Sequence, residues 1–409
     1  MGPRHSPSRT FRILVTTSWI PGGVTTWTHE FANHLADRGH DVTCVLVKLR
    51  WPLVRNPPPF RDVRYNVIWL QAQPLTFLSS VPRLLSAYLP RHRTEIVVST
   101  EAEGINIPSG QRDSAFPPHA AVVHVPEPAY VDPKRLVLAT LGLSKNLLSA
   151  PLWCTKGRQD LGQRMTLWHW QWVQYFGRKR LERAPIVVCV SRAQSNAVQH
   201  AWGISGAKIR VIYNGIDTRE FRPMPVSDRG RECRLLFVGG SNPRKGVDIL
   251  LDAFALVSKR YSGVSLDLVG GWDWSVQKEK ASKLGISSQI RFLPYVVYDN
   301  MPAYYTQSYA FIAPSRGESF GRTVAEAMAC GVPVISTQAG SIPEVVDDGV
   351  SGILVPRDDV KALAEAIIEL LNHPRKANEM GREGRRRVEK YFAWDVVIPQ
   401  WEELFEQLT

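Results

Sequence analysis

Short apolar runs rich in β-branched residues alternate with helix-length segments along both halves of the chain. In the first half, strands are predicted at 12–17, 40–47, 95–100, 120–125 and 185–190. Between the first two of these, Trp27, Phe31 and Leu35 share one helical face, and Gly39 provides a stop. Strands that alternate with helices form parallel sheets with crossover helices, so the fold class is α/β.

The second half repeats the pattern after an interruption. Its strands are predicted at 234–240, 265–271, 289–294, 309–315, 332–336 and 352–356. The segment 211–233 breaks the alternation with an Asn-Gly turn, prolines and charges, as linkers do. We therefore expect two Rossmann-like, doubly wound domains facing a central cleft. The expected division is a flexible tail at 1–10, a first domain at 11–212, a linker at 213–233, a second domain at 234–391, and a C-terminal helix at 392–409.

The C-terminal helix is expected to pack back on the first domain, with a kink at Pro399. A length of 409 residues suits two or three domains. The chain has 50 Lys and Arg against 38 Asp and Glu, a formal charge of +12. This excess favours anionic partners, which include nucleotides, phosphorylated sugars, nucleic acid and acidic membranes, without choosing among them.

The cysteines and the N-terminus bear on the compartment. The five cysteines form no C-x-x-C pair and lie far apart, so neither a zinc site nor a disulfide framework is expected: Cys44, Cys154, Cys189, Cys233 and Cys330. The start, "MGPRHSPSRT", is polar, and no run of about 18 apolar residues occurs. We expect a cytoplasmic protein without a signal peptide or membrane span.

Two carboxylates, Glu318 and Glu326, lie eight positions apart around a predicted helix start. The preceding strand should end near Ser315, and the helix should run from about residue 321 to 330. The N–H groups of 319–323 then form an anion site. Two carboxylates would repel that anion, but they can accept hydrogen bonds from hydroxyls that flank it. The alternative is that Glu318 favours the helix dipole and Glu326 is a solvated helix residue.

The segment around this pair, "PSRGESFGRTVAEAMACGVPVISTQAGSIPEVVDDGVSGILVP", resembles the donor-site signature of family 4 glycosyltransferases. These are retaining, nucleotide-sugar-dependent enzymes of GT-B fold. The resemblance extends to 190–198, 211–223 and 235–254, and it is looser in the first half. It implies that the first domain binds an acceptor and that the second binds the donor.

The resemblance also implies roles for the residues around the pair. Glu318 would contact hydroxyls of the transferred sugar, and Glu326 would accept from the ribose hydroxyls. Backbone N–H groups around Phe320 and Gly321 would hold the phosphates. The same donor-binding turn includes Ser319, Arg322 and Thr323.

The motif "GGSNPRKG" (239–246) follows a predicted strand and supplies two cations. Arg244 and Lys245 can neutralise the charge of a departing nucleoside diphosphate, a preorganised electrostatic role. The alternative is a solvated basic turn. The family often has a basic residue where Gly240 stands, so Arg244 is the candidate to replace it, and Lys245 is the clearer assignment.

Four further residues are candidates by resemblance. Gly22 and Gly23 lie in the loop after the first strand, which lacks the G-x-G-x-x-G fingerprint; the loop either borders the diphosphate or acceptor or is a tight turn. His124 ends a strand, where it either lies against the donor sugar or is structural. Tyr295 belongs to the segment 290–300, which would read the base.

The segment 151–183 combines an apolar stripe at helical spacing with seven Lys and Arg. Packing against the first domain is the favoured interpretation. The alternative is a surface for an anionic or lipid-linked acceptor.

The expected function is a hexosyl transfer, with retention, from a UDP- or GDP-linked sugar to the hydroxyl of a sugar, glycolipid or small molecule. No Asp-x-Asp motif is evident, so no metal and no cofactor are expected, and nucleic acid is not an expected partner. Peripheral membrane association is an alternative that is not favoured. The rival functions are a nucleotide-sugar 2-epimerase of the same fold, which needs no acceptor, and a non-catalytic sugar-nucleotide-binding protein. A dehydrogenase would need the missing glycine fingerprint.

Overall fold

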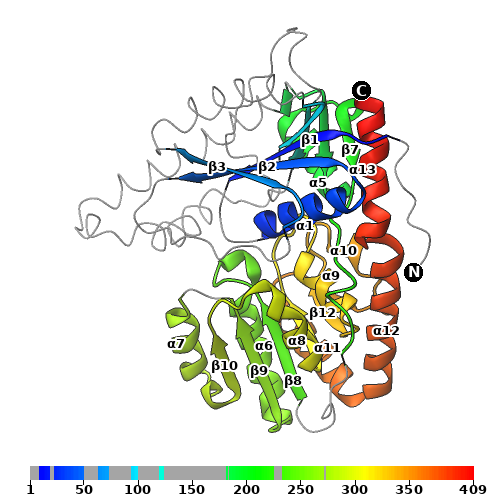
Figure 1. Ribbon diagram of the computed structural model, residues 1–409. Coiled ribbons are helices and arrows are strands. Elements are labelled where there is room, and N and C mark those ends of the chain that lie inside the picture. Colours follow the sequence, from blue (N-terminus) through cyan, green and yellow to red (C-terminus); the bar gives the residue numbers. More distant parts are fainter. Residues whose placement is uncertain are drawn as a thin grey trace. The chain divides into compact units, whose positions relative to one another are not determined.

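The structure is a computed structural model that describes residues 9–18, 23–49, 63–72, 94–99, 119–123, 181–182, 184–224, 233–270 and 273–409. It contains two compact units (Figure 1). The first comprises the described residues up to Gly215 together with Trp394–Thr409, and the second comprises Ile216–Ala393. Residues 216–224, expected in the linker, thus belong to the second unit, and the C-terminal change of unit falls after Ala393.

The first unit is built on a parallel sheet with the strand order β3-β2-β1-β4-β5-β6-β7. Its strands are β1 (Arg12–Ser18), β2 (Asp41–Leu49), β3 (Asn66–Ala72), β4 (Ile96–Ser99), β5 (His119–Val123), β6 (Ile186–Cys189) and β7 (Ile209–Val211). The described helices are α1 (Gly23–Asp37), α5 (Arg192–Trp202), the short η5 (Gly206–Lys208) and α13 (Trp394–Leu408).

Aromatic side chains hold α13 against α1 in this unit. Trp27 and Phe31, which were predicted to share a helical face, are both buried. The ring of Phe31 lies 4.9 Å from that of Trp401, and the ring of Trp27 lies 6.0 Å from that of Trp394. The helix α13 continues through Pro399.

The second unit has a parallel sheet with the order β10-β9-β8-β11-β12-β13. Its strands are β8 (Cys233–Val238), β9 (Val264–Val269), β10 (Ile290–Leu293), β11 (Ala310–Ala313), β12 (Val334–Thr337) and β13 (Ile353–Val355). The α-helices are α6 (Val247–Arg260), α7 (Ser275–Lys283), α8 (Met301–Gln307), α9 (Arg322–Ala329), α10 (Ile342–Val345), α11 (Val360–Asn372) and α12 (Pro374–Tyr391). The short helices are η6 (Pro243–Lys245), η7 (Ser287–Gln289) and η8 (Tyr298–Asn300).

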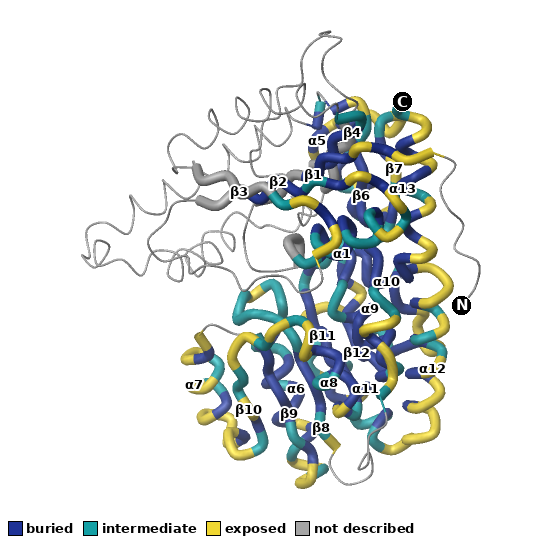
Figure 2. The backbone as a smooth tube through the Cα atoms, viewed as in Figure 1, coloured by how far each residue is buried: buried dark blue, intermediate teal, exposed yellow. Residues whose placement is uncertain are grey.

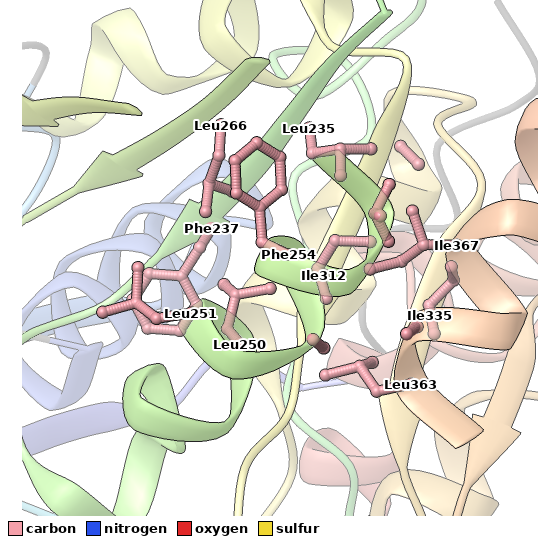
Figure 3. Packing of buried hydrophobic residues seen from close by; sticks show 14 of the residues in the cluster. Leu235, Phe237, Leu250, Leu251, Phe254, Leu266, Ile312, Ile335, Leu363 and Ile367 are labelled. Carbon is pink, nitrogen blue, oxygen red and sulfur yellow. The ribbon is translucent and has the colours of Figure 1, made fainter. Parts of the chain in front are cut away.

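The core of the second unit lies between the sheet and the helices α6 and α11 (Figure 3). Phe237 on β8 and Phe254 on α6 are both fully buried there. Ile335 on β12 and Leu363 on α11 extend the same cluster. The strands of this unit are mainly buried, while α7 and α12 each expose one side to solvent (Figure 2).

Both sheets have the doubly wound strand order of Rossmann-like folds, as expected. In each sheet the direction of strand addition reverses once, between β1 and β4 in the first unit and between β8 and β11 in the second. Ligands of such sheets bind beyond the carboxyl ends of the strands at this switch point. A ligand site of the second unit is therefore expected at the loops that follow β8 and β11.

Candidate functional site

The loop after β8 carries the two predicted cations in the short helix η6 (Pro243–Lys245). The side chain of Asn242 caps this helix by accepting a hydrogen bond from the N–H of Arg244 at 2.9 Å. Gly246 ends it with a φ of 68°. A β-carbon at Gly246 would overlap the carbonyl oxygen of Pro314. Glycine therefore lets the turn lie directly against the loop that follows β11.

Hydrogen bonds join this turn to the loop after β11. The N–H of Arg316 donates to the carbonyl oxygen of Arg244 at 2.7 Å, and Nη1 of Arg244 donates to the carbonyl oxygen of Gly317 at 3.1 Å. The guanidinium of Arg316 binds Asp248 through two bonds of 2.9 and 2.8 Å and Asp358 at 2.6 Å. The two loops thus form one tied structure, and part of the guanidinium of Arg244 is engaged in holding it.

The side chains of Lys245 and Glu318 form an ion pair between these two loops. Nζ of Lys245 lies 2.7 Å from Oε1 of Glu318, and the hydroxyl of Ser315 donates to the same oxygen at 2.8 Å. The side chains of Lys245 and Glu318 are 21% and 10% exposed. The backbone carbonyl of Glu318 accepts from the N–H of Ser341 at 3.1 Å. Glu318 is thus held by both its side chain and its backbone.

The charge state of Glu318 follows from these neighbours. Burial alone would raise the pKa of its carboxyl group. The charges of Lys245 and Arg244, with the hydrogen bonds from Lys245 and Ser315, outweigh burial and hold the pKa below its ordinary value. Glu318 is therefore ionised at neutral pH, beside two cations.

The helix α9 begins directly after this pair. Gly321 caps it in the left-handed region with a φ of 88°, and a β-carbon there would overlap the side chain of Ile342. The first N–H groups of any α-helix have no acceptor within the helix, and the positive end of its dipole lies there. The ring of Phe320 is buried and packs on Phe392 at 5.4 Å. Phe320 can therefore offer only its backbone to a phosphate.

Glu326 lies further along α9 and is only 4% exposed, so it is not a solvated helix residue. The hydroxyl of Tyr298 donates to Oε1 at 3.0 Å, and that of Tyr305 donates to Oε2 at 3.0 Å. Nη2 of Arg322 lies 3.3 Å from Oε1. Burial, followed by the charge of Glu326, raises the pKa of Tyr305 well above its ordinary value, so Tyr305 remains a donor.

The other predicted residues of the second unit differ in their position and exposure to solvent. A β-carbon at Gly240 would meet nothing within 4 Å, so a side chain would fit there. Tyr295 lies between β10 and η8 and is 48% exposed. Ser319 and Thr323, on either side of the start of α9, are half-buried.

Several predicted site residues belong to the first half of the chain, most of which lies outside the described residues. Gly23 is the first residue of α1. Gly22 and His124 lie outside the described residues, as does 151–183 apart from 181–182. Their proposed roles therefore stay predictions.

Sequence reasoning missed residues that hold the predicted ones in place. Ser315 and Ser341 bond Glu318, Tyr298 and Tyr305 bond Glu326, and Arg316 ties the two loops. Ser315 was expected at the end of the preceding strand, and Arg316 and Ser341 lie in the quoted donor signature, but no role was predicted for any of the three. The tyrosines belong to a different segment from Glu326, and nothing in their spacing indicates the contact.

The described residues also bear on metal binding and membrane spanning. Within them, no three His, Cys, Asp or Glu side chains come together in the manner of a metal site. The helices of the described ranges are all too short or too polar to cross a bilayer.

Two Rossmann-like, doubly wound units are the architecture of GT-B proteins, and solved structures share this fold. Sucrose-phosphate synthase from Thermosynechococcus elongatus is 23% identical, with a TM-score of 0.73 over 97% of this chain and 98% of that chain. HepE from Anabaena, solved in complex with UDP and glucose, is 20% identical, with a TM-score of 0.72 over 97% of this chain and 100% of that chain.

Two protein families match this sequence. The family "Glycosyl transferases group 1" matches residues 224–387, and "Glycosyltransferase Family 4" matches residues 21–220. The chain therefore belongs to the group 1, family 4 type of glycosyltransferases.

Individual relatives match over part of their length. A GDP-mannose-dependent alpha-(1-6)-phosphatidylinositol monomannoside mannosyltransferase from Mycolicibacterium smegmatis is 31% identical over 52% of this chain and 59% of the relative. A D-inositol 3-phosphate glycosyltransferase from Acidothermus cellulolyticus is 32% identical over 48% of this chain and 49% of the relative. The matches thus span about half the length of these curated relatives.

Proposed function

We propose that the protein is a retaining glycosyltransferase that moves a sugar from a UDP- or GDP-linked donor to an acceptor hydroxyl without a metal ion. One observation carries the proposal. The ion pair of Lys245 and Glu318 lies at the switch point of the second sheet, beside the start of α9. A cation, an ionised acceptor and a helix N-terminus together match the needs of a diphosphate joined to a hydroxylated sugar.

Each group has a separate task in this proposal. Lys245, assisted by Arg244 and the N-terminus of α9, stabilises the negative charge that grows on the diphosphate as the sugar leaves. Glu318 accepts hydrogen bonds from sugar hydroxyls and holds the anomeric carbon in place. Because the Lys245–Glu318 pair is formed within the protein, both groups are preorganised before the donor arrives.

The proposal includes retention of configuration and independence of metal ions. The bond from the anomeric carbon to the diphosphate oxygen breaks, and the acceptor oxygen forms its bond on the same face. The leaving phosphate takes the acceptor proton, so no side-chain base is required. Fixed cations and the helix dipole do the work that a divalent ion does in other enzymes.

The donor and acceptor classes draw support from the relatives. HepE was solved with UDP and glucose, and the M. smegmatis relative is named as GDP-mannose-dependent. The two curated relatives above are named for phosphatidylinositol monomannoside and D-inositol 3-phosphate. Polyol phosphates and inositol lipids are therefore the first acceptors to test.

The test is a transfer assay with UDP- and GDP-linked hexoses, run with 5′-diphosphate detection and mass spectrometry of the acceptor. We expect release of one nucleoside diphosphate for each glycosylated acceptor, retention of the anomeric configuration by NMR, and full activity in EDTA. Loss of activity in EDTA that Mg²⁺ or Mn²⁺ restores would contradict metal independence. A changed sugar formed from donor alone would favour the epimerase.

A further inference from the structure

The hydroxyl of Tyr298 connects Arg322 to Glu326. Nη2 of Arg322 donates to this hydroxyl at 2.6 Å, and the hydroxyl donates to Oε1 of Glu326 at 3.0 Å. The guanidinium also lies over the ring of Tyr298, 5.8 Å from its centroid. The cation therefore holds the ring and orients the hydroxyl, since an arginine can only donate.

A second tyrosine and a phenylalanine complete the support of Glu326. Tyr305, which is fully buried, donates to Oε2, so each carboxylate oxygen accepts one phenolic hydroxyl. The ring of Phe221 packs against both tyrosines, 5.2 Å from Tyr298 and 6.0 Å from Tyr305. Two bonds on two oxygens fix the plane of the carboxylate, which a single bond would not.

Tyr298 also opens η8, which lies at the end of the segment 290–300 that is expected to read the base. The residue therefore links the base side of the donor site to the carboxylate expected at the ribose.

We propose that Tyr298 is a positioning residue that fixes the Glu326 carboxylate for the ribose hydroxyls, so that the donor site selects ribonucleotides over 2′-deoxyribonucleotides. The proposal rests on the proposed function, in which Glu326 accepts from the ribose. Oε1 of Glu326 accepts from Tyr298 and lies 3.3 Å from Nη2 of Arg322, and Oε2 accepts from Tyr305. A carboxylate has about four acceptor directions.

The selectivity has a physical reason. A 2′-deoxynucleotide lacks one of the two hydroxyls that can donate to Glu326. A site built to bond a hydroxyl rejects the analogue without it, because a desolvated polar group then loses its partner. The size of this penalty depends on how firmly the acceptor is held, and Tyr298 and Tyr305 hold it.

The experiment uses the full chain and isothermal titration. UDP, GDP and ADP are tested first, and the nucleotide that binds best is then compared with its 2′-deoxy counterpart. We expect the ribonucleotide to bind about tenfold more tightly or better, the range for a hydrogen bond to a charged group. In Tyr298→Phe this ratio should fall several-fold, and in Glu326→Gln it should approach one.

Matched variants separate positioning from general stability. Tyr309→Phe removes a phenolic bond to the carbonyl oxygen of Leu370 in the same unit, and it should leave the ratio unchanged. Arg322→Gln removes both the group that orients the Tyr298 hydroxyl and a 3.3 Å contact to Glu326, so it should lower the ratio at least as much as Tyr298→Phe does. An unchanged ratio in Arg322→Gln would therefore still count against positioning if Tyr298→Phe is unstable.

Two results would overturn the proposal while leaving the proposed function intact. The first is equal affinity of the unaltered protein for ribo- and 2′-deoxyribonucleotide. The second is an unchanged ratio in both Tyr298→Phe and Arg322→Gln, which would make the tyrosine a packing residue. Failure of the unaltered protein to bind any of the three nucleotides would instead reject both proposals.

Discussion

At the scale of single residues, the two glutamates of the donor signature differ in their surroundings more than their shared motif suggests. Glu318 is paired with a cation, and its pKa is held low against the effect of burial. Glu326 accepts hydrogen bonds from two tyrosine hydroxyls and lies 3.3 Å from Nη2 of Arg322, on its own helix. One carboxylate is therefore part of a charged pair at the switch point, and the other is a fixed acceptor inside α9.

These different surroundings predict that substitution of the two glutamates changes different kinetic parameters. Glu318→Gln should chiefly lower kcat, because the sugar and Lys245 both lose their anchor. Glu326→Gln should chiefly weaken donor binding, by about 1–3 kcal/mol, the range for a hydrogen bond to a charged group. Steady-state kcat and KM, together with nucleotide affinity by titration, check both. Reversed effects would show that the two roles are exchanged.

Single residues also show where prediction from sequence reaches its limit. Lys245, Glu318 and Gly321 were predicted as parts of one donor site from the resemblance to family 4 glycosyltransferases, and the structure places Lys245 against Glu318 just before the Gly321 cap of α9. The contacts of Tyr298, Tyr305 and Arg316 could not be predicted. They join segments far apart in sequence, and they depend on rotamers that packing decides.

At the scale of elements, α13 is fixed to the first unit by a buried cluster. Glu402 on α13 accepts two bonds from Arg38, at 2.5 and 2.7 Å, and lies 3.1 Å from Nε2 of His40. Nδ1 of His40 accepts from the N–H of Phe11 at 3.1 Å. His40 is therefore neutral, with its proton on Nε2 directed to Glu402.

Protonation of His40 should weaken this cluster. Burial lowers its pKa below 6.5, although Glu402 opposes the shift. Between the lowered pKa and about 6.5 the unfolded chain binds more protons than the folded chain, so stability rises with pH. We expect chemical unfolding to become easier as the pH falls below about 6.5, with a slope from His40 of at most ~1.4 kcal/mol per pH unit.

His40→Asn provides the comparison. Its side-chain oxygen can still accept from Phe11, but it does not titrate and cannot reach Glu402 as the imidazole does. The variant should be less stable at pH 7.5 and should lose less stability between pH 7.5 and 5.5. If urea unfolding shows the same pH dependence of stability in the variant and the unaltered protein, His40 does not cause it.

Most strands could be predicted from sequence. Runs such as 12–17 and 265–271 are rich in Val, Leu and Ile, as expected for largely buried strands, and β1 and β9 lie there within two residues. The strands β3 and β7 were not predicted. β7 has only three residues beside an expected linker. β3, at the edge of its sheet, was missed although its sequence NVIWLQA contains an apolar run.

At the scale of the whole molecule, both units repeat one strand order, but the described site contacts belong to the second unit. Lys245 and Glu318 come from loops after β8 and β11, the strands that flank its switch point. The central claim is therefore that this pair serves the reaction and does not merely stabilise the fold.

The most direct test of that claim is kcat for Lys245→Ala at saturating donor, measured beside thermal unfolding. Lys280→Ala, which removes a similar partly exposed ion pair with Asp252 in the same unit, is the control. We predict that kcat falls about 10²–10³-fold in Lys245→Ala, as for loss of one preorganised charge-stabilising group, with the fold intact. Lys280→Ala should turn over normally. Near-normal turnover of Lys245→Ala would contradict the account.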